Sequence, residues 1–294
     1  MKCTLCGREK FNIVKKRIRD SHVHSVVTCK KCGLVQLSPR PSLKKEQEFY
    51  DKNLQSKNIL SPTDIKTITL NSLHDTNRRA DFVGKHCNKK SHILDIGSGD
   101  GLFLKEMEGR GYNITGLEVS KERRETSKKV AKAKVLDINL LKDQPPADFK
   151  KFDGVTLIHV LEHIIDPVLF LQNIAKNFLK KDGSIIIEVP NLDDLLVVEN
   201  KQYDAFYWQR GHVFYFNKKT LTQVVKKGGF LIKSFEYVQR YGLENFMHWQ
   251  VKGKPQIDKP TFQIEGEYKW LEDYYKSYLC KIGKSDTMII VIKP

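Results

Sequence analysis

Apolar residues beyond residue 90 follow two periodicities that take turns along the chain. Short apolar runs bounded by glycine or polar residues predict buried strands at 92–96, 113–119, 133–136, 154–158, 184–189, 230–238 and 287–292. Apolar residues at helical spacing predict helices at 102–110, 121–131, 166–178 and 218–227. In the third of these helices the expected apolar face consists of Leu169, Phe170, Ile174 and Phe178. Strands that alternate with helices predict an α/β fold with a mostly parallel sheet covered on both faces.

The first 90 residues have a different pattern. Residues 1–41 hold two Cys-x-x-Cys pairs around a basic stretch, and Pro39 and Pro41 favour an extended linker after them. Residues 42–90 are polar and are expected to be mostly helical, as a linker or lid. We therefore predict a cysteine module at 1–41, a helical segment at 42–90 and an α/β domain at 91–294, in which 191–217 is a separate, aromatic-rich segment.

Charge adds a constraint on partners. Lys and Arg number 51 against 35 Asp and Glu, which gives a formal net charge of +16. These cations are spread along the chain rather than gathered in one block, so a solvated surface explains them better than a nucleic-acid site. A positive field also suits an anionic small molecule. The chain has no apolar run long enough for a membrane span and no apolar signal segment, so a cytoplasmic protein is expected.

Two copies of Cys-x-x-Cys-Gly point to a metal site. Four thiolates suit tetrahedral zinc, and a closed four-thiolate site is structural because no coordination position stays open. The glycine after each second cysteine is expected to adopt a positive φ in a knuckle. His22 and His24 are expected to lie in a strand and not to bind the metal. The predicted ligands are Cys3, Cys6, Cys29 and Cys32.

A glycine-rich turn follows the predicted strand 92–96. Its spacing is D-x-G-x-G-x-G, and Leu102 stands where a dinucleotide-binding turn would have its third glycine. Such a turn lets the backbone approach a ligand closely. A second acid, Glu118, ends the next strand, where its carboxylate can accept hydrogen bonds from both hydroxyls of a ribose.

The order of these motifs resembles that of the class I S-adenosylmethionine-dependent methyltransferases. Asp137-Ile138 follows the third strand, where this class contacts adenine, and 159–167 is close to the HVLEH-x-x-DP phrase of the family. The resemblance covers residues 91–294 and implies a Rossmann-like, seven-stranded methyltransferase sheet beside a zinc-ribbon-like module. It implies that S-adenosylmethionine contacts Asp95, Gly97, Gly99, Gly101, Glu118, Asp137, Ile138 and His159.

Methyl transfer needs an aligned acceptor whose proton can leave, so histidine is a suitable base. The candidates are His212 and His163. The segment 191–217, which contains Tyr203, Phe206, Tyr207 and Trp208, is expected to line the acceptor pocket. The context of His212 resembles the Y-x-E-H-x-x-Y-F phrase of sugar C-methyltransferases, although Gln209 and Gly211 replace its Tyr and Glu. Residues 162–163 resemble part of the metal-binding E-x-x-E-H of quinone-precursor O-methyltransferases, which leaves a catalytic magnesium open.

These resemblances imply a small-molecule methyltransferase whose acceptor is a sugar or nucleotide-sugar of surface glycan biosynthesis. One alternative is an RNA methyltransferase that uses the cysteine module and surface lysines. Phe11 is the only aromatic residue of that module, which leaves little for base stacking. Another alternative is a catalytically idle, S-adenosylmethionine-binding zinc protein. Whether oxygen, nitrogen or carbon is methylated stays open at this point.

Overall fold

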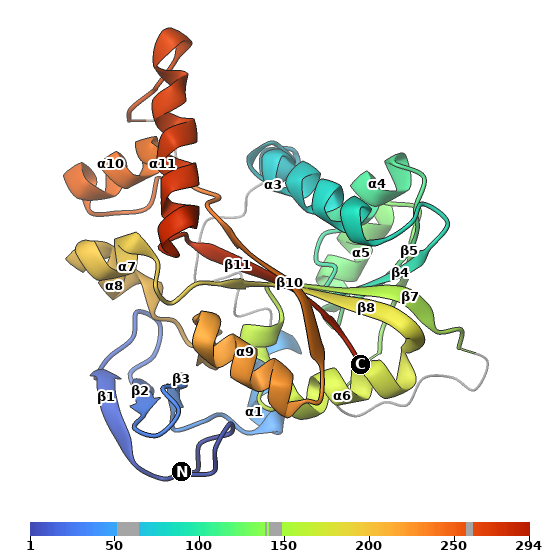
Figure 1. Cartoon of the computed structure of the whole chain (residues 1–294), viewed down its shortest axis with the longest axis horizontal. Coiled ribbons are helices and arrows are strands. Elements are labelled where there is room, and N and C mark those ends of the chain that lie inside the picture. The colour runs from blue at the N-terminus through green and yellow to red at the C-terminus, as the bar shows by residue number, and fades with distance from the viewer. Residues whose placement is uncertain (52–64, 139, 141–148, 257–260) are drawn as a thin grey trace. The chain divides into compact units, whose positions relative to one another are not determined.

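The computed structural model describes residues 1–51, 65–138, 140, 149–256 and 261–294, and its largest sheet has seven strands (Figure 1). The strand order is β10-β11-β8-β7-β4-β5-β6. Strand β4 pairs in parallel with β5 and β7, and β5 pairs in parallel with β6. The strands are β4 (His92–Ile96), β5 (Asn113–Leu117), β6 (Lys134–Leu136), β7 (Phe152–Ile158), β8 (Leu179–Pro190), β10 (Leu231–Val238) and β11 (Thr287–Lys293). The predicted α/β fold with a seven-stranded sheet is confirmed.

The four helices predicted from helical spacing are all present. They are α4 (Leu102–Gly109), α5 (Lys121–Val130), α6 (Pro167–Asn177) and α9 (Lys218–Lys227). Helix α6 begins after Asp166, whose carboxylate accepts a hydrogen bond from the Leu169 backbone N–H at 3.0 Å. The predicted apolar face of α6 was wrong at one position: Leu169 was expected to be buried, but it is 59% exposed. It is not three or four residues from any of the buried Phe170, Leu171 or Ile174, so it lies on another side of the helix.

The chain divides into two compact units. Unit 1 comprises Met1–Arg40, Glu188–Val224 and Ser234–Ile290. Unit 2 comprises Pro41–Ile187, Val225–Lys233 and Val291–Pro294. The cysteine module therefore shares a unit with the segment after β8, while the glycine-rich turn belongs to unit 2.

Unit 1 contains a second, four-stranded sheet. Strands β1 (Phe11–Lys15), β2 (Ser25–Cys29) and β3 (Val35–Ser38) form an antiparallel meander. The short strand β9 (Phe214–Tyr215) joins its edge antiparallel to β3, with Val35 opposite Tyr215. A segment far away in the sequence thus completes the sheet of the cysteine module.

One hydrophobic cluster of unit 1 joins the module to this later segment. The module contributes Ile18, Val26, Val35 and Leu37, and the later segment contributes Tyr207, Trp208 and Tyr215. Fully burying an apolar side chain of this size stabilises a fold by about 1.5–3 kcal/mol. The module therefore gains from residues 207–215 a core that a segment of its own length is too short to provide.

Segment 42–90 was expected to be helical. It contains α1 (Leu43–Asp51) and α3 (Ile65–His86), while residues 52–64 lie outside the described part.

His22 and His24 were expected in a strand, and this was wrong. They lie in the turn before β2, where Nδ1 of His24 hydrogen-bonds to Oγ of Ser21 at 2.8 Å.

Other elements were not predicted from the sequence. They are η1 (Leu161–His163), α7 (Leu195–Glu199), α8 (Lys201–Tyr207), α10 (Leu243–Lys252), η2 (Gly266–Tyr268) and α11 (Lys269–Ile282).

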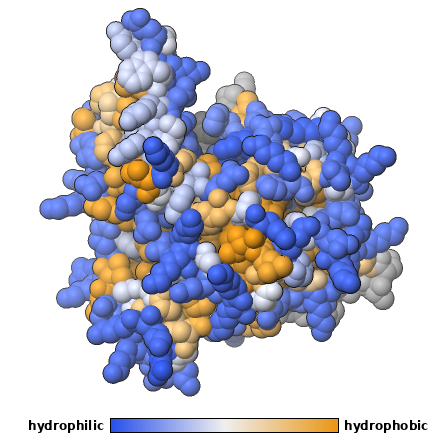
Figure 2. All heavy atoms as spheres, viewed as in Figure 1, coloured by the Kyte–Doolittle hydropathy of each residue, from blue (hydrophilic) through white to orange (hydrophobic). Residues whose placement is uncertain are grey.

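Hydrophilic side chains predominate on the face drawn in Figure 2, with smaller patches of hydrophobic ones between them. This agrees with cations dispersed along the sequence. Across the described ranges, no helix combines the length and apolar character that a bilayer crossing requires.

Candidate functional site

The glycine-rich turn of unit 2 connects β4 to α4. Its Gly97, Gly99 and Gly101 all have positive φ, and the backbone N–H groups of Gly97 and Ser98 donate to the Leu117 carbonyl at 2.8 and 3.0 Å. A Cβ on Gly101 would lie 2.3 Å from Oγ of Ser127, so this position is closed by packing. A Cβ on Gly99 would have no neighbour nearer than 3.9 Å. Gly99 is therefore where the turn leaves room for a ligand against the backbone.

Asp95 lies one residue before the end of β4 and is 2% exposed. Its carboxylate accepts a hydrogen bond from Oγ1 of Thr156 on β7 at 2.6 Å. Burial raises the pKa of Asp95 to about 7, and the Thr156 hydrogen bond opposes this only in part. Thr156 was not among the predicted site residues, although a hydroxyl within the apolar run 154–158 was a usable signal.

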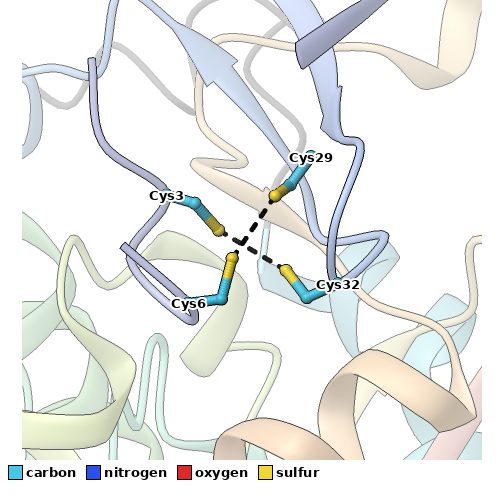
Figure 3. A group of neighbouring side chains, drawn as sticks. All are labelled: Cys3, Cys6, Cys29 and Cys32. Atoms are coloured by element: carbon cyan, nitrogen blue, oxygen red, sulfur yellow. Dashed lines mark hydrogen bonds between the residues drawn. The ribbon is translucent and has the colours of Figure 1, made fainter. Parts of the chain in front are cut away.

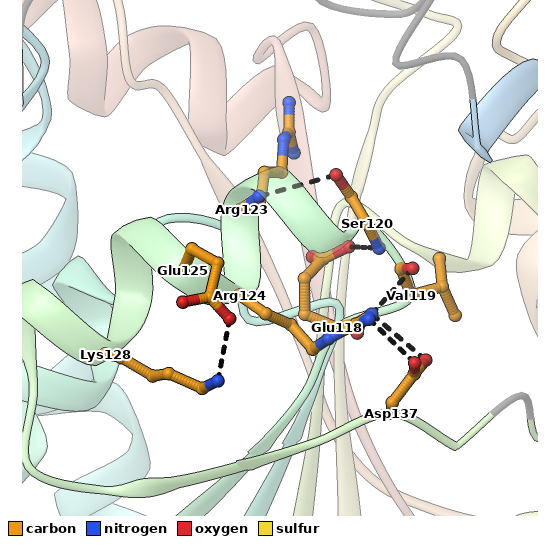
Figure 4. Close-up of polar contacts among 8 residues, drawn as sticks. All are labelled: Glu118, Val119, Ser120, Arg123, Arg124, Glu125, Lys128 and Asp137. Carbon is orange, nitrogen blue, oxygen red and sulfur yellow. Dashed lines mark hydrogen bonds and ion pairs between the residues drawn. The ribbon is translucent and has the colours of Figure 1, made fainter.

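Glu118, directly after β5, has both carboxylate oxygens bonded to backbone N–H groups, and Figure 4 draws the bond to Ser120. One carboxylate oxygen accepts from the Gly99 backbone N–H at 3.0 Å, and the other accepts from the Ser120 backbone N–H at 2.8 Å. The structure thus brings together Gly99 and Glu118, two predicted site residues that are 19 positions apart. Each carboxylate oxygen has two lone pairs, so capacity remains for ligand hydroxyls.

Asp137 is paired with Arg124 of α5 (Figure 4). The two nitrogens of the guanidinium donate to the two carboxylate oxygens at 3.0 and 2.7 Å, and Nη1 also donates to the Glu118 carbonyl at 2.7 Å. Such bidentate pairs fix geometry as well as charge. Arg124 therefore links the segment after β5 to that after β6, and Ile138 is half-buried next to it. The sequence carried no signal for this arginine.

The loop after β7 contains a strained histidine beside a buried acid. His159 has φ 53°, which is rare for a residue with a side chain. Its Nδ1 lies 3.3 Å from a carboxylate oxygen of Glu162, and Nε2 of His163 lies 4.0 Å from the same oxygen. The Glu162 side chain is 1% exposed. The predicted residues His159 and His163 thus both lie near the carboxylate of Glu162, which the sequence singled out only through its resemblance to a metal-binding motif.

The four cysteines of the CxxCG pairs converge in unit 1 (Figure 3). The Sγ atoms of Cys3 and Cys32 are 3.5 Å apart, as are those of Cys6 and Cys29. Tetrahedral zinc with bonds of about 2.3 Å separates its sulfur ligands by about 3.8 Å, so the cluster has the size that zinc requires. The expected positive φ is present at Gly7 and Gly33.

Backbone N–H groups donate to sulfurs of this group, and burial opposes their effect on the thiol pKa to a different extent at each one. Burial raises the pKa of the Cys29 thiol, but N–H donation from Cys32 and Lys31 outweighs it and lowers that pKa to about 7. Donation from Cys6 and Leu5 acts in the same direction at Cys3, where burial prevails and the pKa stays raised. The donors come from the knuckle backbone, so they belong to the fold of the module.

His212 lies in unit 1, before β9, whereas His163 lies in unit 2. The Nε2 atom of His212 is 2.9 Å from Nε2 of Gln209, and its ring meets that of Tyr215 edge to face at 5.6 Å. The Tyr215 hydroxyl accepts from the Gln209 backbone N–H at 2.8 Å and donates to its carbonyl at 2.9 Å. Gln209 was noted in the sequence only as a departure from a family phrase, but it contacts the candidate histidine directly.

The aromatic residues expected over an acceptor pocket mostly fill the core of unit 1. Tyr207 and Trp208 are 9% and 3% exposed and belong to the cluster shared with the module. The ring of Phe206 lies under the guanidinium of Arg19 at 4.1 Å. Tyr203 meets Trp249 edge to face at 4.9 Å. These contacts pack the stretch that precedes His212 against other parts of unit 1.

Comparison with known proteins agrees with this arrangement. Residues 73–234, more than half of the chain, match a family described as a methyltransferase domain. A ubiquinone biosynthesis O-methyltransferase of Glaesserella parasuis is 33% identical over 107 residues, which are 34% of this chain and 45% of that protein. The corresponding enzyme of Pelagibacter ubique is 31% identical over 149 residues, covering 49% and 60%. The chain spans about half the length of the curated relatives it matches.

Solved structures share the fold. An S-adenosylmethionine-dependent methyltransferase of Archaeoglobus fulgidus superposes with TM-score 0.52 at 20% identity, covering 76% of this chain and 94% of that one. A structure from Thermotoga maritima, described as a possible histamine N-methyltransferase, gives TM-score 0.52 at 17% identity, covering 84% and 99%. The shared fold agrees with the family match, which spans more than half of the chain: the chain belongs to the methyltransferase domain family.

Proposed function

We propose that the protein transfers a methyl group to oxygen on an anionic small molecule, with nucleotide-linked sugars as the first acceptors to test. Two observations support this. The curated relatives are named O-methyltransferases of ubiquinone biosynthesis, which favours oxygen over carbon or nitrogen. The net charge of +16 favours an acceptor that carries negative charge.

The cofactor is held by unit 2. S-adenosylmethionine supplies an electrophilic methyl group on a sulfonium, and the residues present fit such a ligand. Gly99 leaves open space at the backbone, Glu118 keeps acceptor capacity for ribose hydroxyls, and Asp95 offers a buried carboxyl to a cationic amino acid. The Asp137–Arg124 pair orders the segment that would flank adenine. The Glu118–Gly99 hydrogen bond carries this assignment, because it joins the two parts of the binding surface.

Calorimetry and a transfer assay test the proposal together. S-adenosylmethionine should bind to the wild-type protein and lose nearly all affinity in Gly99→Val, because a branched side chain would occupy the open space. Labelled methyl transfer should appear with nucleotide-sugars or other anionic hydroxyl compounds. Preferential binding of NAD would overturn the cofactor assignment. Transfer to RNA alone, with binding that weakens steeply with salt, would replace the acceptor class.

The second element of the proposal is a structural zinc bound by Cys3, Cys6, Cys29 and Cys32. The spacing of the four Sγ atoms supports it. Elemental analysis of protein purified without chelators should find a single zinc ion per chain, because four thiolates complete one tetrahedral site. Protein that contains almost no zinc after such a purification would contradict the assignment.

His212 and His163 are the proposed acceptor-side residues. The His163 side chain is 23% exposed, and His212 is held by Gln209 and Tyr215. Such packing suits a group that must keep its orientation toward a reacting atom. His212→Ala should lower turnover with S-adenosylmethionine affinity preserved. Near-normal turnover in that variant would move the role to His163.

A further inference from the structure

Helix α11 of unit 1 packs on its neighbours with one side only. On that side Leu279 is buried, and the Glu272 carboxylate accepts from two backbone N–H groups at the start of α10 at 3.0 and 2.9 Å. The ring of Tyr275 lies 5.8 Å from that of Phe246 on α10. Since positions 272, 275 and 279 are three and four residues apart, they share one side of the helix. This side attaches α11 to α10.

Another side of α11 carries large aromatic and apolar side chains in solvent. Trp270, Tyr274, Tyr278 and Ile282 recur every four residues and are 59%, 62%, 46% and 45% exposed. The rings of Tyr274 and Tyr278 are stacked, with 13° between their planes and 6.0 Å between their centroids. Side chains of intermediate hydropathy, drawn pale, cover much of α11 in Figure 2. We call these four residues the α11 stripe.

The α11 stripe has the composition and size of the core of an interface. Trp and Tyr are enriched at protein interfaces and contribute much of their binding energy. Because a fully exposed aromatic side chain presents about 150–250 Å², the stripe exposes on the order of 400 Å². A patch of that size on a soluble protein indicates an interaction site. A standard interface takes about 800 Å² from each partner, so the stripe supplies about half and its polar flanks supply the rest.

The charges beside the stripe indicate what covers it. Within 265–284 the exposed acids lie in the first half, whereas the second half has lysines and, at its exposed positions, no acid. The acids are Glu265, Glu267 and Asp273, and the lysines are Lys276, Lys281 and Lys284, with Lys269 as the exception in the first half. RNA or an anionic membrane would be repelled by the acids. An identical helix that runs antiparallel brings the acids of each copy toward the lysines of the other.

The spacing of the stripe suits a two-fold axis at its middle. The midpoint of 270–282 is position 276, so in an antiparallel pair Tyr274 of one copy faces Tyr278 of the other. The exposed residues Asp273 and Lys281 are centred on position 277, so each of them also lies near its opposite in the second copy. A row of side chains at four-residue spacing is a ridge that fits the groove of an identical helix. A patch that binds its own copy closes as a dimer.

We propose that the α11 stripe is the core of a symmetric dimer interface, on which the α11 helix of a second copy of this chain packs antiparallel. The stripe and its flanks lie within 265–284, separate in sequence from the glycine-rich turn, the four clustered cysteines and His212. The dimer therefore does not depend on the proposed function.

Analytical ultracentrifugation over a range of protein concentrations tests the interface. Wild-type protein should sediment with twice the chain mass of 34.1 kDa and dissociate on dilution. Tyr274→Lys should raise the dissociation constant by about 10²-fold or more, because the buried charge occurs twice in a two-fold dimer. Leu169→Lys, at a similarly exposed position of α6, is the matched control and should leave it unchanged. Wild-type protein that stays monomeric at its highest soluble concentration, or equal dissociation constants in the two variants, overturns the proposal.

A charge-reversal cycle tests the antiparallel direction. Lys281→Glu and Asp273→Lys should each raise the dissociation constant by about three- to tenfold, the effect of an exposed charge pair that occurs twice. The double variant should recover most of this loss, because an antiparallel pair joins the two positions. In a parallel pair each position would face itself, so the single changes would have little effect. Inert single variants, or additive losses in the double variant, overturn the antiparallel dimer.

Other occupants of the stripe give a different result. Labelled single-stranded RNA and vesicles of anionic phospholipid are the probes, and Tyr274→Ser removes a stripe ring without adding charge. Binding of either probe should be equal in wild-type protein and in this variant. A monomeric wild-type protein whose binding of RNA or vesicles is lost in Tyr274→Ser overturns the dimer and assigns that occupant to the stripe.

Discussion

At the scale of single residues, the proposed cofactor site of unit 2 depends on a side chain that binds the backbone. The Glu118 carboxylate accepts from the N–H groups of Gly99 and Ser120. Since the same carboxylate is expected to receive ribose hydroxyls, the glycine-rich turn and the ribose contact form one structural feature. A change at Glu118 therefore affects both.

Glu118→Ala should weaken S-adenosylmethionine binding by about 1.5–3 kcal/mol, the range for hydrogen bonds to a charged group. Calorimetry measures this. Glu125→Ala is the matched control, because the Glu125 side chain is exposed on α5, where it pairs with Lys128 (Figure 4). Its affinity should equal that of wild type. Equal affinity in the Glu118 variant would contradict the ribose assignment.

Asp95 makes stability depend on pH. Burial raises its folded-state pKa to about 7, against about 3.8 in the unfolded chain. Between these values the folded state binds more protons than the unfolded state, so the free energy of unfolding falls as the pH rises from about 4 to about 7. Asp194 has a folded-state pKa of about 7, also because of burial, and contributes in the same direction.

Asp95→Asn should therefore flatten, but not abolish, this dependence, and should raise stability above pH 7 relative to wild type. Urea unfolding in mildly acidic and in mildly alkaline buffer provides the comparison. The double variant Asp95→Asn with Asp194→Asn should have a flatter dependence still. A wild-type protein whose stability rises steadily over this interval would show that these carboxyls do not carry the raised pKa values.

At the scale of elements, the glycines at the two ends of α4 differ in whether the structure leaves room for a side chain. Gly101, before α4, has φ 84°, and a Cβ there would meet both Oγ and Cα of Ser127 on α5. A Cβ on Gly109, the last residue of α4, would have no atom within 4 Å, and the φ of Gly109 is not positive. The first glycine is needed for the approach of α4 to α5, and the second is not.

Gly101→Ala should lower the free energy of unfolding by about 1–3 kcal/mol, because it combines left-handed strain with a steric clash. Gly109→Ala should raise it by about 0.5–1 kcal/mol through lower entropy of the unfolded chain. Urea unfolding of both variants measures the difference. Equal stability of the two would contradict the packing of the turn on α5.

At the scale of the whole molecule, the cysteine module does not stand alone. Strand β9 extends its sheet, and its core includes Tyr207, Trp208 and Tyr215. Order in the module and order in the segment around His212 are therefore coupled, whereas the glycine-rich turn belongs to unit 2.

Cys29→Ser should accordingly raise hydrogen exchange in two separate stretches, the module at 11–38 and the segment at 207–216. S-adenosylmethionine affinity, measured on the same protein, should stay close to that of wild type. Cys280→Ser, which changes a cysteine outside the group of Cys3, Cys6, Cys29 and Cys32, serves as the control. Increased exchange confined to residues 1–40 would show that the two parts of unit 1 are uncoupled.

The sequence by itself determined the elements and motifs that depend on neighbours in the chain. Strands and helices from β4 to α6 follow from apolar periodicity, because a period of 2 or 3.6 residues is a local property. The positive φ of Gly97 and Gly99, and the knuckle at Gly7, follow from the residue type at each turn. The motif order that led to the methyltransferase family is of the same kind.

Tertiary structure alone decided which distant side chains meet. Arg19 and Gln209 are 190 residues apart, and no periodicity or motif relates them. The aromatic run at 203–208 was compatible with a pocket wall, but packing against the module buries Tyr207 and Trp208. Arg124 and Asp137 meet because α5, which carries Arg124, packs against β6, which Asp137 follows. The physical reason is common to all three: a side chain's hydrogen-bond partner is selected by proximity after folding, and the sequence pattern records only whether that side chain is polar or apolar.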